Sequence, residues 1–171
     1  MLFSQWSRQT HDFFHKLWLD GLAAEVGILM IPVYRLTTES QGYLEPSWKN
    51  IVHGYRNLST QELEQLSMEH GRKYTGGSHF VSYCCEPTKF LPYLFKRFVA
   101  AGGCFESRKI ENFDELSDSD LVINCTGLGS KELANDSKSH PIRGQVARVA
   151  APYAFEVMLD DSDDGNYVIP K

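Results

Sequence analysis

The sequence predicts a mixed α/β (α+β) fold, and three neighbouring features indicate it. Residues 86–100 have the pattern of an amphipathic helix, and Gly102-Gly103 end this helix by supplying positive φ angles. Residues 104–109 follow as an expected strand. Residues 121–123, Leu-Val-Ile, form a short β-branched-rich run that is typical of a strand buried on both faces. A helix, a glycine turn and two strands in this order indicate an α/β sheet.

The other elements are expected in order along the chain. A helix with an aromatic face covers residues 4–19, and another begins at Ser59, which forms a capping box with Glu62. Pro32 is expected to break the first strand. Strands are expected at residues 24–35, 48–55, 79–84, 143–149 and 155–159, with loops at 39–47 and 68–78, a loop or short helix at 131–140 and a hairpin turn at 160–165.

Composition limits the class of protein. The chain has 171 residues and 42% hydrophobic content, enough for one compact core. Its net charge of −5, with both signs mixed, gives no electrostatic reason to expect nucleic acid or a membrane surface as a partner. No apolar run is long enough to span a bilayer, and the first residues lack the layout of a signal peptide. With no repeat or clear internal boundary, one region is expected over residues 1–171.

The four cysteines do not form a disulfide or zinc pattern. Cys84 and Cys85 are adjacent, while Cys104 and Cys125 stand alone in expected strands. No C-x-x-C spacing occurs, so structural zinc is not expected. Buried, reduced thiols in a reducing compartment are the expectation.

Two other patterns could hold a metal ion. His11 and His15 have i,i+4 spacing, but no third ligand or glutamate follows as in H-E-x-x-H. The acidic residues at 160–165 lack the spaced glycine and terminal glutamate of an EF-hand. No metal is therefore expected.

Small residues follow the expected strand at 121–123. Asn124, Cys125, Thr126 and Gly127 come directly after it. Ligands of open α/β sheets lie beyond the carboxyl ends of the strands, and small residues let a ligand approach the backbone. Two interpretations stay open, a ligand site or an ordinary core strand followed by a glycine turn.

Residues 120–153 resemble the middle of the FAD-dependent D-amino-acid oxidase family, and within it the D-aspartate oxidases more closely. The resemblance rests on NCTGLGSKELA-DS, on P-x-RGQV at 141–146 and on the Ala-Pro-aromatic triplet at 151–153. Residues 45–66, 90–98 and 166–170 also resemble this family in order and spacing. The similarity therefore covers nearly the whole chain.

The resemblance implies a fold, a chemistry and a set of site residues. The fold would be part of an FAD-binding Rossmann-like domain plus part of an antiparallel-sheet substrate domain, both incomplete. The family oxidises D-amino acids to 2-oxo acids with release of ammonia and hydrogen peroxide, and the cofactor carries the chemistry, so no catalytic side chain is assigned. Tyr167 would bind the substrate carboxylate. The expected FAD contacts are Ile110, Cys125, Thr126 and Gly127.

Departures from the family pattern lead to further expectations. The sequence contains no G-x-G-x-x-G phosphate-binding turn, and the family's carboxylate-clamping arginine would follow residue 171. The chain is therefore expected to be the middle portion of an oxidase, inactive and unable to retain FAD alone. The family is peroxisomal, although its targeting tail is absent here, and a cytoplasmic location is the alternative. A homo-oligomer is possible.

Substrate and function leave alternatives open. D-aspartate oxidases carry an arginine before the substrate-site strand, whereas residues 154–166 contain no Arg, Lys or His, and Asp160 or Asp161 falls near that place. The substrate could be D-aspartate or another D-amino acid. A non-enzymatic short product or an interaction module related to the oxidase is the second reading. A small α/β enzyme without FAD is the third, disfavoured because the sequence has no nucleophile elbow or P-loop.

Overall fold

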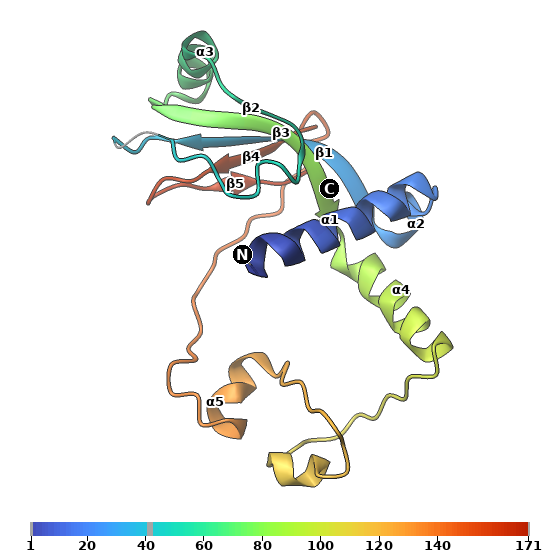
Figure 1. Cartoon of the computed structure of the whole chain (residues 1–171). Helices are drawn as coiled ribbons and strands as arrows, with labels where there is room; N and C mark the ends of the chain where they lie inside the picture. Colours follow the sequence, from blue (N-terminus) through green and yellow to red (C-terminus); the bar gives the residue numbers. More distant parts are fainter. Residues whose placement is uncertain (1, 41–42, 171) are drawn as a thin grey trace. The chain divides into compact units, whose positions relative to one another are not determined.

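The computed structural model describes residues 2–40 and 43–170, and its secondary structure is mixed α/β as predicted. Contacts divide the chain, drawn in Figure 1, into two compact units. The first unit comprises residues 1–101 and 151–171 and contains the sheet. The second unit comprises residues 102–150.

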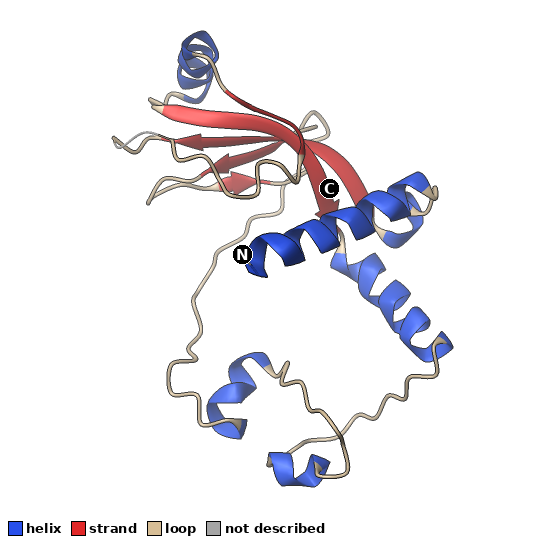
Figure 2. Cartoon of the chain, viewed as in Figure 1, coloured by secondary structure: helices blue, strands red, loops and turns tan. Residues whose placement is uncertain are grey.

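The first unit contains a mixed five-stranded sheet, whose strands are red in Figure 2, and the strand order is β2-β3-β1-β4-β5. The central strand β1 pairs antiparallel with β3 and parallel with β4. The outer pairs, β2 with β3 and β4 with β5, are antiparallel. The strands are β1 Ile28–Thr37, β2 His53–Asn57, β3 Gly76–Cys85, β4 Val157–Asp160 and β5 Tyr167–Val168.

The helices match the strongest sequence signals. The expected capping box is present, because the Ser59 hydroxyl accepts from the Glu62 N–H at the start of α3. Gly102, with φ 88°, follows the end of α4 as predicted. The helices are α1 Leu2–Leu19, α2 Ala23–Val26, α3 Thr60–His70, α4 Pro87–Ala100 and α5 Ser130–Leu133, with short 3₁₀ turns at η1 Phe113–Leu116 and η2 Gly127–Gly129.

Two hydrophobic clusters hold the first unit together, because alternate residues of β1 point to opposite faces of the sheet. On one face, Ile28 packs with residues of α1 and α2; on the other, Ile31 and Val33 pack with β3 and β4. The buried members are Leu17, Ala23, Val26 and Ile28 in the first cluster, and Ile31, Val33, Phe80 and Val157 in the second.

The prediction that Pro32 breaks the first strand is wrong, because β1 runs through it. The carbonyl of Leu36 accepts from Asp161 beside β4, whereas the carbonyl of Thr37 accepts from Thr75 beside β3. Even-numbered residues of β1 therefore direct their backbone groups toward β4. The pairing with β4 begins only at Val33, so the missing N–H of Pro32 costs no bond in that ladder.

Other strand boundaries also differ from the prediction. Residues 23–26 are helical, and Gly27, with φ 77°, ends that helix before β1 begins. Residues 48–52 form turns, and β2 starts only at His53. Strand β4 starts two residues later than expected, and its hairpin with β5 across residues 160–165 is confirmed.

The strands predicted at 104–109, 121–123 and 143–149 are absent from the described structure of the second unit. Leu121 is 77% exposed and Ile123 is 75% exposed, so the prediction of a strand buried on both faces is wrong. Cys104 and Cys125 are exposed as well, and Cys84 and Cys85 only half-buried, which corrects the prediction of buried thiols. A strand requires backbone partners, and the described residues of this unit supply none.

A cluster of imidazole rings joins α1 to the sheet. The side chain of His11 is only 9% exposed, and its ring lies 4.9 Å from that of His53 and 5.1 Å from that of Tyr83. The Nδ1 atom of His15 lies 2.6 Å from the Tyr83 hydroxyl. Burial, reinforced by His53, lowers the pKa of His11 below its ordinary value of 6.5.

We expect acid to destabilise the first unit through His11. The unfolded chain takes up a proton at His11 at a higher pH than the folded chain does, so the free energy of unfolding falls as pH drops below about 6.5. Urea unfolding between pH 7.5 and 5 measures this slope, and His11→Phe should reduce it. The exposed His140 provides the control, because His140→Gln should leave the slope unchanged. Equal slopes in the wild type and His11→Phe would contradict the assignment.

Candidate functional site

Tyr167 lies in a row of residues that crosses three strands of the sheet. Leu159 of β4 is the direct partner of Arg35 on one side and of Tyr167 on the other. Directly opposite residues project to the same face of a sheet, and neighbouring Cα atoms are about 5 Å apart. Arg35 and Tyr167 therefore share one face, with Cα atoms about 10 Å apart. Tyr167 is 63% exposed.

Arg35 is held on this face by aromatic and acidic neighbours. Its guanidinium carbon lies 5.2 Å from the ring centre of Tyr43 and 5.9 Å from that of Trp48. One nitrogen donates to the Tyr43 hydroxyl at 3.2 Å, and another forms a hydrogen-bonded ion pair with Asp161. The Tyr43 hydroxyl also contacts the buried Ser78 hydroxyl at 2.6 Å. These contacts give Arg35 a defined position.

Aromatic side chains continue this surface toward β2. The ring of Trp48 lies 5.0 Å from that of Phe80, and the ring of Tyr55 stacks on Phe80 at 6.2 Å. Burial, followed by the contact with Tyr43, raises the pKa of Tyr55 to about 12. Tyr55 is therefore a neutral phenol at physiological pH, and Arg35 and Asp161 are the charged side chains that this part of the sheet face brings together.

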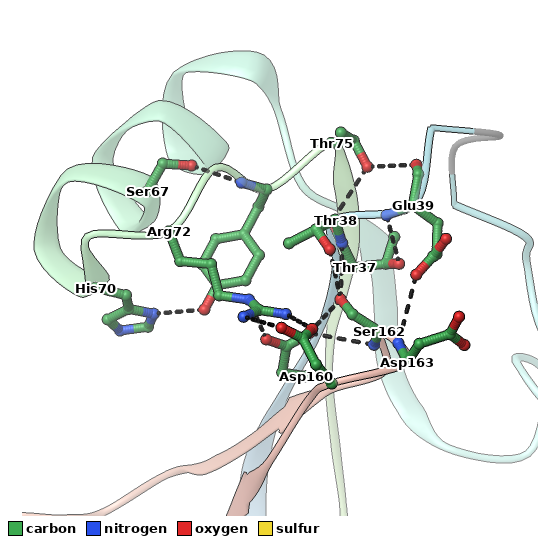
Figure 3. A network of polar contacts seen from close by, with 12 residues as sticks. Thr37, Thr38, Glu39, Ser67, His70, Arg72, Thr75, Asp160, Ser162 and Asp163 are labelled. Carbon is green, nitrogen blue, oxygen red and sulfur yellow. Dashed lines mark hydrogen bonds and ion pairs between the residues drawn. The ribbon is translucent and has the colours of Figure 1, made fainter.

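The β4–β5 hairpin is anchored to the end of β1 (Figure 3). The hydroxyl of Ser162 accepts from the Thr38 N–H at 2.9 Å and donates to Asp160 at 2.5 Å. Arg72 forms ion pairs with both Asp160, at 2.6 Å, and Asp164, at 2.5 Å. These contacts fix the segment that carries Asp161 and leads into Tyr167.

All four predicted FAD contacts lie in the second unit. Three of them are neighbours in the sequence, and Ile110 is separate. Cys125, Thr126 and Gly127 are consecutive and exposed, and Ile110 is half-buried earlier in the same unit. The backbone N–H and the hydroxyl of Thr126 both donate to the side-chain oxygen of Asn124, at 3.1 and 2.7 Å. This Asx-type turn starts η2 and α5.

The turn can meet one edge of a cofactor. Gly127 has a φ of 57°, and a Cβ placed on it would have no neighbour within 4 Å, so a flat group could approach its backbone. The sequence has no G-x-G-x-x-G turn whose N–H groups could hold a pyrophosphate. These residues fit an edge contact with FAD and not the whole cofactor, so no reaction step is derived from them.

Two adjoining grooves lie between α1 and the sheet, and neither Tyr167 nor Arg35 lines them. Their volumes are about 370 and 240 Å³, and they share Ser7, His11 and Ser82 in their linings. Most of their other lining side chains are aromatic or aliphatic, which is typical of imperfect packing between a helix and a sheet. We therefore place the candidate site at the row from Arg35 to Tyr167.

Within 2–40 and 43–170, no group of three or more His, Cys, Asp or Glu side chains is arranged to hold a metal ion. No helix in that part of the chain has the length and apolar character needed to cross a membrane.

Sequence reasoning selected Tyr167 and noted Asp161, but it missed Arg35. Arg35 lies within an otherwise apolar strand, and a single arginine there does not by itself indicate a functional site. Its partner Asp161 is 126 positions away, and only the parallel register of β1 and β4 brings the two together. The available signal was a lone arginine in a predicted core strand, which calls for a buried or half-buried partner.

The fold and the site define a mixed α/β protein whose sheet carries Arg35, Asp161 and the exposed Tyr167 on one face. A family model described as FAD dependent oxidoreductase matches residues 1–171, and the chain belongs to this family. The D-aspartate oxidase of Homo sapiens is 34% identical over 167 residues, which is 97% of this chain and 47% of the relative.

Two D-amino-acid oxidases are similarly related. That of Rubrobacter xylanophilus is 32% identical, covering 97% of this chain and 48% of the relative. That of Dugesia ryukyuensis is also 32% identical, covering 98% and 48%. The chain spans about half the length of the curated relatives that it matches.

We expect Arg72 to hold the β4–β5 hairpin in one conformation, because Asp160 and Asp164 both form ion pairs with it. Arg72→Gln should leave the fold intact and accelerate amide hydrogen exchange at residues 160–165 several-fold. Arg56→Gln is the matched control, since Arg56 pairs with Glu62 instead. Unchanged exchange in Arg72→Gln would show that the backbone contacts alone hold the hairpin.

Proposed function

We propose that the protein containing this chain is an FAD-dependent oxidase of D-amino acids, D-aspartate or others. It would oxidise them to the imino acid, which water hydrolyses to the 2-oxo acid and ammonia, with hydrogen peroxide formed from oxygen. The observation that carries the proposal is the collinear match of the whole chain to D-aspartate and D-amino-acid oxidases. The exposed Tyr167 on an anchored sheet face supports it.

FAD, when bound, would supply the redox chemistry, namely a hydride acceptor for the substrate α-carbon and a route for the electrons to oxygen. The residues of this chain bind and orient. The phenol of Tyr167 can donate one hydrogen bond to the substrate carboxylate, while its ring offers an apolar surface to the rest of the molecule. The anchored hairpin holds the backbone that leads into Tyr167, which lowers the entropy cost of placing this residue for binding.

The residues proposed to contact FAD lie in the second unit. Cys125, Thr126 and Gly127 would lie against FAD, and the backbone of Ile110 would meet its adenine side. The open surroundings of Gly127 support a close approach of a flat ligand. Resemblance to the family also suggests a peroxisomal location.

A related non-enzymatic product or interaction module is the second candidate. The exposure of Leu121 and Ile123 in the second unit favours it, because apolar residues on a surface are commonly covered by a partner. Bound flavin distinguishes the two candidates.

The first prediction of the proposal is flavin reduction by D-amino acids. Anaerobic mixing of the FAD-loaded native protein with D-alanine or D-aspartate should bleach the flavin absorbance, and air should restore it with release of hydrogen peroxide. The L-enantiomers are the controls and should leave the flavin oxidised. A flavin that no D-amino acid bleaches would exclude the proposed activity.

The second prediction concerns Tyr167. In the native protein, Tyr167→Phe should raise KM for D-substrates roughly tenfold, because a hydrogen bond to a charged group contributes about 1.5–3 kcal/mol. The matched control is Tyr153→Phe, since Tyr153 is also exposed but lies outside the row. If both variants behave like the wild type, Tyr167 is not in the site.

The third prediction concerns the cofactor. The 171-residue chain alone should not retain FAD through gel filtration, because its described residues provide an edge contact without a pyrophosphate turn. Absorbance at the flavin wavelengths across the protein peak measures retention. Stoichiometric flavin in that peak would show that Thr126 and its neighbours suffice.

A further inference from the structure

We propose that the Arg35–Asp161 ion pair sets the side-chain specificity of this site, favouring neutral D-amino acids over acidic ones. The carboxylate of Asp161 is paired with the guanidinium of Arg35, which a second substrate carboxylate would otherwise bind. The inference rests on the proposed function, because it takes the substrate to be a D-amino acid held at Tyr167.

The register of β1, β4 and β5 indicates in which direction the substrate side chain would lie. Within the described residues, β5 lies at one edge of the sheet and β4 and β1 lie on its other side. A substrate whose α-carboxylate binds Tyr167 and whose side chain lies toward β4 passes over Leu159, and the next side chain in that row is Arg35. The Cα separation of about 10 Å between Arg35 and Tyr167 suits a small amino acid lying between two side chains.

Arg35 by itself would suit an acidic substrate. A guanidinium binds carboxylates through two parallel hydrogen bonds, and the flanking rings of Tyr43 and Trp48 hold it in one orientation. Its side chain is 23% exposed, so solvent reaches part of it. The chemistry of Arg35 alone would therefore favour D-aspartate.

The carboxylate of Asp161 reverses the preference for an acidic substrate that Arg35 alone would give. This carboxylate is paired with the Arg35 guanidinium, and the backbone N–H of Asp161 donates to the Leu36 carbonyl at 2.8 Å. The next residue, Ser162, is tied to Thr38, so Asp161 is fixed on both sides of its own backbone. An incoming carboxylate would meet a cation that is already neutralised, next to a fixed negative charge.

The surrounding charges add to this effect. The hairpin carries four carboxylates, at Asp160, Asp161, Asp163 and Asp164, and residues 154–166 contain no Arg, Lys or His. The nearby Arg72 is shared by Asp160 and Asp164. The local charge is therefore negative, which disfavours a dicarboxylate and leaves the binding of a neutral side chain unaffected.

The test is a comparison of substrate ratios in the FAD-loaded native protein. The measured quantity is kcat/KM for D-aspartate divided by kcat/KM for D-alanine. The wild type should prefer D-alanine. Asp161→Asn frees the charge of Arg35 and should raise the ratio about tenfold or more. The double variant Arg35→Gln/Asp161→Asn should return the ratio to the wild-type range, because the freed cation is gone.

Asp163→Asn is the matched control. It removes one charge from the same hairpin without touching Arg35 and should change the ratio much less than Asp161→Asn does. Flavin content and thermal unfolding of each variant identify those that fail to fold. For such a variant, Asp161→Ser replaces Asp161→Asn, since it also removes the carboxylate and keeps the backbone N–H.

Three results would overturn the inference: a wild type that prefers D-aspartate, an unchanged ratio in Asp161→Asn, or a raised ratio that persists in the double variant. Failure of the proposed function is a separate result, because then no D-amino acid, neutral or acidic, reduces the flavin.

Discussion

The pairing of β1 with a strand on each side is the constraint on which the rest of the first unit depends. On one side ten residues of β1 match ten residues of β3, and on the other four residues match β4. The second pairing joins parts of the chain that are far apart, since Thr38 and Ser162 are separated by 124 positions. Because closing so long a loop costs conformational entropy, the ladder and the buried side chains on both faces must offset it.

Alternation along β4 then divides the charges of the hairpin between the two faces of the sheet. Asp160 is the register partner of Leu36 and reaches Arg72, whereas Asp161 follows on the other face and reaches Arg35. Two neighbouring carboxylates thus have different cations, and the separation follows from the period of two residues in a strand. A one-residue slip of β4 against β1 would exchange the two faces and break both ion pairs.

Local signals were predictable from the sequence, and contacts between distant residues were not. The capping box at Ser59, the helix from Pro87 and the turn before Tyr167 depend on residues within a few positions of one another. Residues 121–123 have the composition of a buried strand, yet composition does not provide a pairing partner. The pair of Arg35 and Asp161 depends on the register of two strands, which no short pattern encodes. For the site residues, Tyr167 came from resemblance to a family, and its sharing of a face with Arg35 needed the structure.

Pro32 has a further consequence, for association between chains. Residues 28–32 of β1 extend beyond the start of β4, and among the described residues no strand pairs with them on that side. An open strand edge is a template on which another chain can add a strand. The ring of Pro32 removes one donor from this edge, next to the point where the parallel ladder with β4 begins at Val33. Pro32 therefore costs the native ladder no bond and makes this open edge a poorer template for a strand of another chain.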